Sequence, residues 1–164
     1  MPPVLLIIDV QEGFINDWTR HMPAAVEALQ ARFPRVVATR FENREGSPFR
    51  TLKALARFAP GSAEGRLAFV PRPDAEIAVK TGYTAVSDKF LASLREGQVR
   101  EVAVSGIATD NCVLVTAVDL FQAGLRPLVL ADYCASHAGE AYHRAGLMLL
   151  ERLVGEGQIV RGPI

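Results

Sequence analysis

The sequence is poor in cysteine, in net charge and in long apolar runs. Its 164 residues include two cysteines, and 18 Lys and Arg residues balance 18 Asp and Glu residues. This balance disfavours polyanionic partners such as nucleic acid or an acidic membrane surface. No apolar run reaches the roughly 18 residues that a membrane helix needs, and the N-terminus lacks the basic region of a signal peptide. We therefore expect a cytoplasmic protein that binds a small-molecule substrate, with no nucleic acid or membrane partner.

Cysteine and histidine are too widely spaced for a recognisable metal motif. Cys112 and Cys134 fit no metal-ligand spacing, and no histidine lies between His21 and His137. A reducing cytosol also disfavours a structural disulfide. We therefore expect no cofactor and no metal, and each thiol needs its own explanation. For Cys134 we expect structural burial.

Short apolar runs alternate with segments of helical pattern along the whole chain. The expected strands cover residues 4–10, 35–40, 76–80, 101–106 and 126–132, with a sixth candidate from residue 158. The expected helices cover residues 23–33, 49–58, 87–95, 111–123 and 138–154. The strands are rich in Val, Ile and Leu, as is typical of central strands covered on both faces. The pattern predicts an α/β fold, with a parallel sheet between helical layers in one domain over residues 1–164.

A long stretch without clear periodicity covers about residues 42–74. It is rich in Gly and Pro, and we expect long loops around one short helix that form a lid or binding loop. Residues 40–74 carry four acidic and seven basic side chains, the latter being Arg40, Arg44, Arg50, Lys53, Arg57, Arg66 and Arg72. A solvated loop face is the favoured interpretation. Orientation of a substrate carboxylate by one or two arginines stays open.

Three chemically distinctive residues lie at or just beyond the ends of expected strands. Asp9 ends the first apolar run, Lys80 ends the third, and Cys112 lies in the turn after the fourth. Each alone has an ordinary explanation, as a turn acceptor, a solvated lysine or a small buried side chain. Parallel strands bring their carboxyl ends to one edge of the sheet, where active sites of open α/β sheets lie. Together the three residues would supply a carboxylate, a cation and a nucleophile.

The chemistry of a thiol explains why these residue types belong together. A free thiol has a pKa of about 8.5, so a nucleophilic cysteine needs a lowered pKa, a nearby base, or both. We expect the N-terminus of the helix at 111–123 and the charge of Lys80 to lower the pKa of Cys112. Asp9 would then accept the thiol proton.

Three motifs resemble the isochorismatase-like cysteine hydrolase superfamily, which includes nicotinamidases and N-carbamoyl amidases. They are "LLIIDVQEGF", "VKTGY" and "VSGIATDNCV", the last followed by "TAVDLFQAGLRPLVLADYCAS", and the resemblance runs from Val4 to Ser136. It implies a three-layer α/β/α fold with a six-stranded, mainly parallel sheet and a catalytic triad of Asp9, Lys80 and Cys112. It also implies a homo-oligomer, usually a dimer or a tetramer.

The same resemblance implies the details of the nucleophile turn. It places a cis peptide bond between Ile107 and Ala108, and it assigns the backbone N–H groups of Ala108 and Cys112 to an oxyanion hole. Nicotinamidases carry metal-binding aspartate and histidine residues after the second strand. Here that stretch reads "TRFENREGSPF" without histidine. We therefore expect a metal-free member of the superfamily.

The leading hypothesis is a cysteine hydrolase that cleaves an amide or ureido C–N bond of a small metabolite through a thioester. We expect Phe14, Trp18, Arg40, Phe41 and Tyr83 to line its substrate pocket. One alternative is vinyl ether hydrolysis of the isochorismatase type, in which the aspartate donates a proton and the cysteine is dispensable. Another is a scaffold that binds without turnover, although such a role does not require a base beside a thiol.

Overall fold

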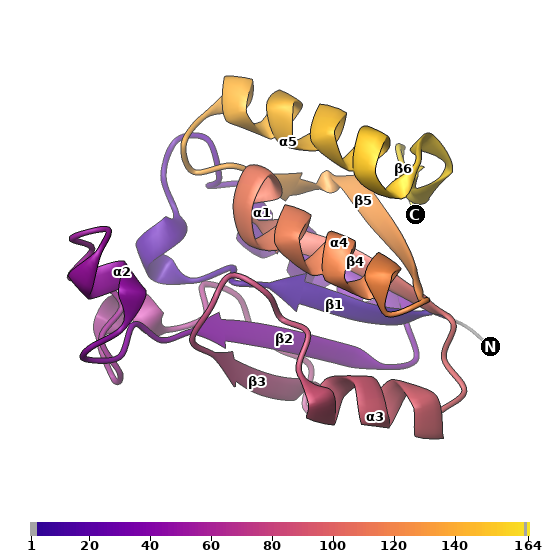
Figure 1. The fold of residues 1–164 in the computed structure, drawn as a ribbon, viewed down its shortest axis with the longest axis horizontal. Helices are drawn as coiled ribbons and strands as arrows, with labels where there is room; N and C mark the ends of the chain where they lie inside the picture. The colour runs from indigo at the N-terminus through magenta and orange to yellow at the C-terminus, as the bar shows by residue number, and fades with distance from the viewer. Residues whose placement is uncertain (1–2, 163) are drawn as a thin grey trace.

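Six strands form one parallel sheet in the computed structural model, which describes residues 3–162 and 164. The strand order is β3-β2-β1-β4-β5-β6, and every neighbouring pair is parallel (Figure 1). The strands are β1 (Val4–Ile8), β2 (Val36–Phe41), β3 (Glu76–Lys80), β4 (Glu101–Ile107), β5 (Arg126–Ala135) and β6 (Ile159–Val160). The order reverses between β1 and β4, which is where open α/β sheets place their ligand sites.

Helices cover both faces of this sheet. They are α1 (Met22–Leu29), α2 (Pro48–Thr51), α3 (Asp88–Glu96), α4 (Leu114–Gln122) and α5 (Glu140–Val154). Every residue of β1 is buried, and alternate side chains enter two different cores. Leu5 and Ile7 pack with residues of α1, whereas Leu6 and Ile8 pack with residues of α3, α4 and α5. The predicted three-layer α/β/α fold with a six-stranded sheet is confirmed.

Strand β3 is exposed on one face, although the sequence predicts a strand that is covered on both faces. It pairs only with β2 at one edge of the sheet. The side chains of Ile77 and Val79 are 41% and 45% exposed. The apolar run therefore predicts the strand correctly, but its position at the edge leaves one face open.

The prediction of a helix over residues 49–58 is also wrong, because α2 ends at Thr51. Ala54 and Phe58 have positive φ angles of 55° and 65°, which a right-handed helix cannot contain. Buried Asn43 holds this loop, since its side-chain amide donates to the carbonyl groups of Leu55 (2.7 Å) and Arg57 (2.9 Å). These loops lie beyond the carboxyl ends of β1, β2 and β3 (Figure 1). No helix in the described part of the chain is long and apolar enough to cross a membrane.

Candidate active site

The side chains of Asp9, Lys80 and Cys112 form a buried cluster at the carboxyl edge of the sheet. Lys80 Nζ lies 2.6 Å from Asp9 Oδ2 and 3.4 Å from Cys112 Sγ. The ammonium group also donates to the carbonyl groups of Gly82 (2.8 Å) and Tyr83 (3.0 Å). The lysine is therefore fixed between the carboxylate and the thiol.

Neighbouring polar groups on β2 fix the position of Asp9 after β1. Thr39 Oγ1 donates to Asp9 Oδ1 (2.7 Å) and accepts the Asp9 backbone N–H (3.2 Å). The side chain of Gln11 forms hydrogen bonds with both the carbonyl (3.0 Å) and the N–H (2.8 Å) of Phe41. Asp9 Oδ2 forms the ion pair with Lys80 but no well-aligned hydrogen bond within the described part of the chain. This oxygen is thus placed to accept a proton.

Cys112 lies in a π-helical turn, Thr109–Val113, and not inside a helix that begins at residue 111, as the sequence predicts. The Val113 N–H donates to the Ala108 carbonyl (3.1 Å), which is the wide hydrogen bond of a π turn, and α4 begins only at Leu114. The Ile107–Ala108 peptide bond, where the resemblance implies a cis bond, is cis in the structure.

Helix α5 packs directly against this turn. A Cβ atom on Gly146 would lie 2.7 Å from the backbone nitrogen of Asp110, so the close approach requires glycine. Thr109 Oγ1 and His143 Nδ1 form a hydrogen bond of 2.7 Å. The turn that carries the thiol is therefore held by β4 on one side and by α5 on the other.

The electrostatic environment of Cys112 differs from the sequence-based expectation of a lowered pKa. Burial, reinforced by the negative charge of Asp9, raises the pKa of Cys112 to about 12 and outweighs the opposing effect of Lys80. Burial alone would lower the pKa of Lys80, but its interactions with Asp9 and Cys112 prevail and raise it. The resting cluster thus has a protonated thiol beside a charged ammonium group, and the thiol needs a base before it can react.

An apolar pocket of about 230 Å³ opens onto the cluster. Its aromatic walls are Phe14, Phe41, Phe49, Phe58 and Tyr83. The Phe14 and Phe58 rings stack with centroids 4.2 Å apart, and the ring of Phe49 meets those of Phe41 and Tyr83 edge-on at 4.9 Å. Since Cys112 is also a lining residue, a flat molecule in this pocket would reach the thiol.

Two of the five residues predicted for the pocket lie elsewhere. Phe14, Phe41 and Tyr83 line it. Trp18 is 55% exposed and borders a separate hollow beside Gly139, because the chain turns away from the sheet edge after Phe14. Arg40 points away to form an ion pair with Glu42 at 3.1 Å.

Sequence reasoning missed several pocket residues. Phe49 and Phe58 were expected inside a regular helix, and no chemical role was predicted for His137. His137 reaches the pocket because β5 extends to Ala135, beyond its expected end. Burial lowers the pKa of His137, and its Nδ1 atom has no hydrogen-bond partner among the described residues. The strand expected from the sequence ends at residue 132, so it gave no signal that would have placed this histidine at the pocket.

Cys134 is buried, as expected, and burial raises its pKa to about 12.

The described residues offer no set of metal ligands. Among residues 3–162 and 164, no group of three or more His, Cys, Asp and Glu side chains could hold a metal ion. After β2, the carboxylate of Glu42 pairs with Arg40 and Arg44. The side chains present after β2 therefore do not fit a metal ion.

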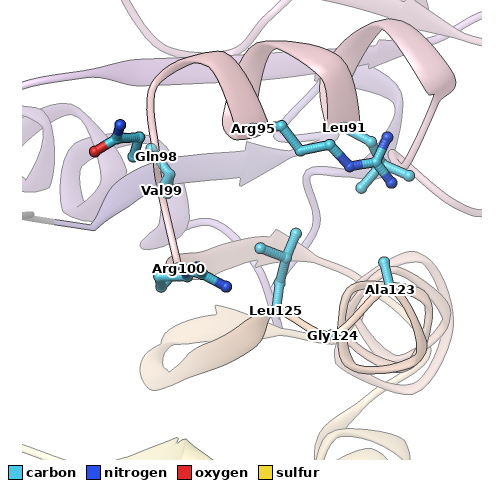
Figure 2. A pocket seen from close by; sticks show the side chains of 8 residues that line it. All are labelled: Leu91, Arg95, Gln98, Val99, Arg100, Ala123, Gly124 and Leu125. Carbon is cyan, nitrogen blue, oxygen red and sulfur yellow. The ribbon is translucent and has the colours of Figure 1, made fainter.

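A larger hollow, of about 730 Å³, lies near the amino-terminal ends of β4 and β5, away from the carboxyl ends that hold the cluster, and Figure 2 shows the side chains that line it. It is bordered by the end of α3, the end of α4 and the segments that lead into β4 and β5, with Arg95 and Leu125 among its residues. No member of the buried cluster lines it. Size alone thus does not identify the candidate site, because the reactive groups lie beside the smaller, apolar pocket.

Comparisons with known proteins agree with this fold. The model of the isochorismatase domain family matches residues 3–158. The uncharacterized isochorismatase family protein PncA of Bacillus subtilis (strain 168) is 38% identical over 71 residues, which are 43% of this chain and 39% of that protein. The matched part thus spans about two fifths of the relative's length.

Solved structures with low sequence identity share the whole architecture. A pyrazinamidase of Pyrococcus horikoshii in complex with zinc has a TM-score of 0.82 at 18% identity and covers 100% of both chains. An N-carbamoylsarcosine amidase from Thermoplasma acidophilum has a TM-score of 0.78 at 19% identity and covers 98% of this chain and 95% of its own. At these identities the likeness shows the fold alone.

Proposed function

Because the chain belongs to the isochorismatase family, we propose that it is a cysteine hydrolase that cleaves an amide or ureido C–N bond of a small molecule. A fold by itself does not establish an activity. The observation that carries the proposal is the buried contact of Lys80 with both Asp9 and Cys112, directly beside an apolar pocket. The names of two structural relatives, a pyrazinamidase and an N-carbamoylsarcosine amidase, support a C–N bond as the target.

In the first half-reaction, Cys112 Sγ attacks the substrate carbonyl carbon while the thiol proton passes to Asp9 Oδ2. The pKa of Cys112, raised to about 12, means that the thiol stays protonated until this base removes its proton. The charge on Lys80, 3.4 Å from Sγ, stabilises the thiolate character that develops during attack. Asp9 and Lys80 therefore have complementary roles, one as proton acceptor and one as fixed cation.

The tetrahedral intermediate then collapses to a thioester. We assign the backbone N–H groups of Ala108 and Cys112 as donors to the oxyanion, since donors of this kind stabilise acyl-transfer transition states by roughly 3–4 kcal/mol. Asp9 returns the proton to the leaving nitrogen, and the C–N bond breaks. Water then attacks the thioester with Asp9 as base, the C–S bond breaks, and Cys112 regains its proton. The net reaction consumes one water and releases an acid and an amine or ammonia.

The two cysteines provide a matched test of this mechanism. We expect Cys112→Ala to reduce hydrolysis in a panel of small amides and ureido compounds by roughly 10³-fold or more, because the nucleophile is removed. Cys134→Ala should retain activity. Ammonia release measures turnover, and mass spectrometry of the intact protein detects the acyl adduct on Cys112.

Two results would count against the proposal. Full activity of Cys112→Ala would exclude the thioester and favour chemistry in which Asp9 donates a proton, as in vinyl ether hydrolysis. Absence of both turnover and an acyl adduct across the panel would count against C–N hydrolysis.

A further inference from the structure

The two charged side chains that line the pocket are both cationic. Lys53 and Arg57 line the pocket, and no aspartate or glutamate appears among its described lining residues. The deeper Asp9 carboxylate is already paired with Lys80. We propose, on the basis of the proposed function, that the substrate is a small, flat amide that carries a carboxylate, and that Lys53 binds this carboxylate.

Lys53 is held at the pocket wall with its charge unpaired. Its Nζ donates to the hydroxyl of Tyr83 (3.2 Å) and lies 5.6 Å from the centre of the Tyr83 ring. No carboxylate within the described residues lies within 4.0 Å of this ammonium group, the limit for an ion pair. Tyr83 thus positions Lys53 without neutralising it, and the remaining N–H donors suit a carboxylate.

Arg57, the other cation at this pocket, is paired with a carboxylate. Its guanidinium donates to Glu64 (3.2 Å) and to the carbonyl of Gly13 (3.0 Å). Glu64 in turn accepts the backbone N–H of Phe58 (2.8 Å). Arg57 is therefore committed to the loop structure, which leaves Lys53 as the group that recognises the anion.

The size and lining of the pocket define the rest of the substrate. A volume of about 230 Å³ is below the roughly 300–1,000 Å³ of pockets for drug-sized ligands, so a single ring or an acyl group of similar size fits. The stacked and edge-on aromatic side chains of the wall favour a planar group. With the scissile carbonyl at Cys112, the carboxylate lies toward Lys53 and Tyr83.

The test compares two probes that differ by one carboxylate group, benzamide and 3-carboxybenzamide. Their binding to Cys112→Ala is measured by calorimetry, and their hydrolysis by the unaltered chain is measured by ammonia release. We expect 3-carboxybenzamide to bind at least about tenfold more tightly than benzamide, as a charge-assisted hydrogen bond predicts. Adding Lys53→Ala should remove this difference, whereas Lys53→Arg should keep most of it. Lys89→Ala, which changes an exposed lysine beside Glu76, is the control that should change nothing.

The outcomes separate this proposal from the proposed function. Equal binding of the two probes, binding of neither, or a preference that survives Lys53→Ala would overturn the assignment of Lys53. Tight, Lys53-dependent binding of the anionic probe without its hydrolysis would support the carboxylate site and count against the catalytic mechanism.

Discussion

Cys112 and Cys134 are both free, buried cysteines, but the groups that surround them differ. The two side chains are 9% and 4% exposed, and burial is the main cause that raises the pKa of each thiol to about 12. Yet Cys112 lies beside Asp9 and Lys80, whereas Cys134 makes a weak contact of 3.8 Å with the Val104 carbonyl. The resting pKa therefore does not distinguish a nucleophile from a structural thiol. The ion pair of Asp9 and Lys80 beside the sulfur does.

Gly106 connects the two regions. It pairs with Ile8 of β1 and with Cys134 of β5, and it precedes the turn that carries Cys112. Its φ angle is 121°, and a Cβ atom here would lie 2.1 Å from the Ile8 carbonyl oxygen. One backbone position thus fixes the distance between β4 and β1, the strand that leads into Asp9.

Gly106→Ala is the most disruptive change that we predict. The added methyl group must push apart two central strands and adopt an unfavourable φ angle, so the free energy of unfolding should fall by about 3 kcal/mol or more. Urea denaturation measures this loss. Gly157→Ala is the control, because a Cβ atom there meets no heavy atom within 4 Å, and its effect should stay within about 0.5 kcal/mol. Equal effects of the two variants would refute the close-packing argument.

Asp9→Asn should separate the two thiols chemically. The charge of Asp9 is the second-largest cause that raises the pKa of Cys112. Its removal lowers that pKa, and each unit increases the thiolate fraction roughly tenfold below the pKa. We therefore expect faster alkylation of Cys112 by iodoacetamide at pH 8.5, measured by mass spectrometry, while hydrolysis is lost because the base is missing.

The control for this experiment is Asp132→Asn. The charge of Asp132 raises the pKa of Cys134 but is not among the causes that act on Cys112. This variant should therefore leave the alkylation rate of Cys112 unchanged. A slower or unchanged reaction of Cys112 in Asp9→Asn would mean that Asp9 does not control this thiol.

The sequence predicts the fold and the meeting of strand ends better than it predicts the pocket. Apolar runs that alternate with helical segments predict a parallel sheet. A parallel sheet brings Asp9, Lys80 and the turn with Cys112 to one edge, independently of the conformation of the loops. The pocket wall depends on contacts between distant residues. Asn43 shapes the loop that places Phe58, and no local pattern predicts these hydrogen bonds.

The expected pKa of Cys112 was wrong for a related reason. A helix N-terminus and a lysine are visible in the sequence, and both lower the pKa of a thiol. Desolvation depends on how completely the fold encloses the sulfur, and the strength of the interaction with Asp9 depends on the exact side-chain geometry. The sizes of both effects emerge only in the folded chain, and here the two effects together outweigh that of Lys80.

The smallest effect that we predict concerns His143, which supports the turn of Cys112 but has no counterpart at Cys134. Burial lowers the pKa of His143, despite the opposing charges of Glu140 and Asp110, while His21 and Arg144 lower it further. Below about pH 6.5 the unfolded chain therefore binds more protons than the folded chain, so stability is full above this pH and falls as the pH decreases. His143→Ala should cost about 1 kcal/mol at pH 7.5 through the lost hydrogen bond with Thr109.

The pH dependence distinguishes this role from simple packing. Between pH 7.5 and 5.5, the free energy of unfolding from urea denaturation should fall less in His143→Ala than in the unaltered chain, because one group that resists protonation is gone. Some slope should remain, since burial also lowers the pKa of His137. Gly157→Ala, which changes no titratable side chain and meets no heavy atom within 4 Å, should keep the original slope. An unchanged slope in His143→Ala would mean that the hydrogen bond to Thr109 holds the nucleophile turn without coupling it to pH.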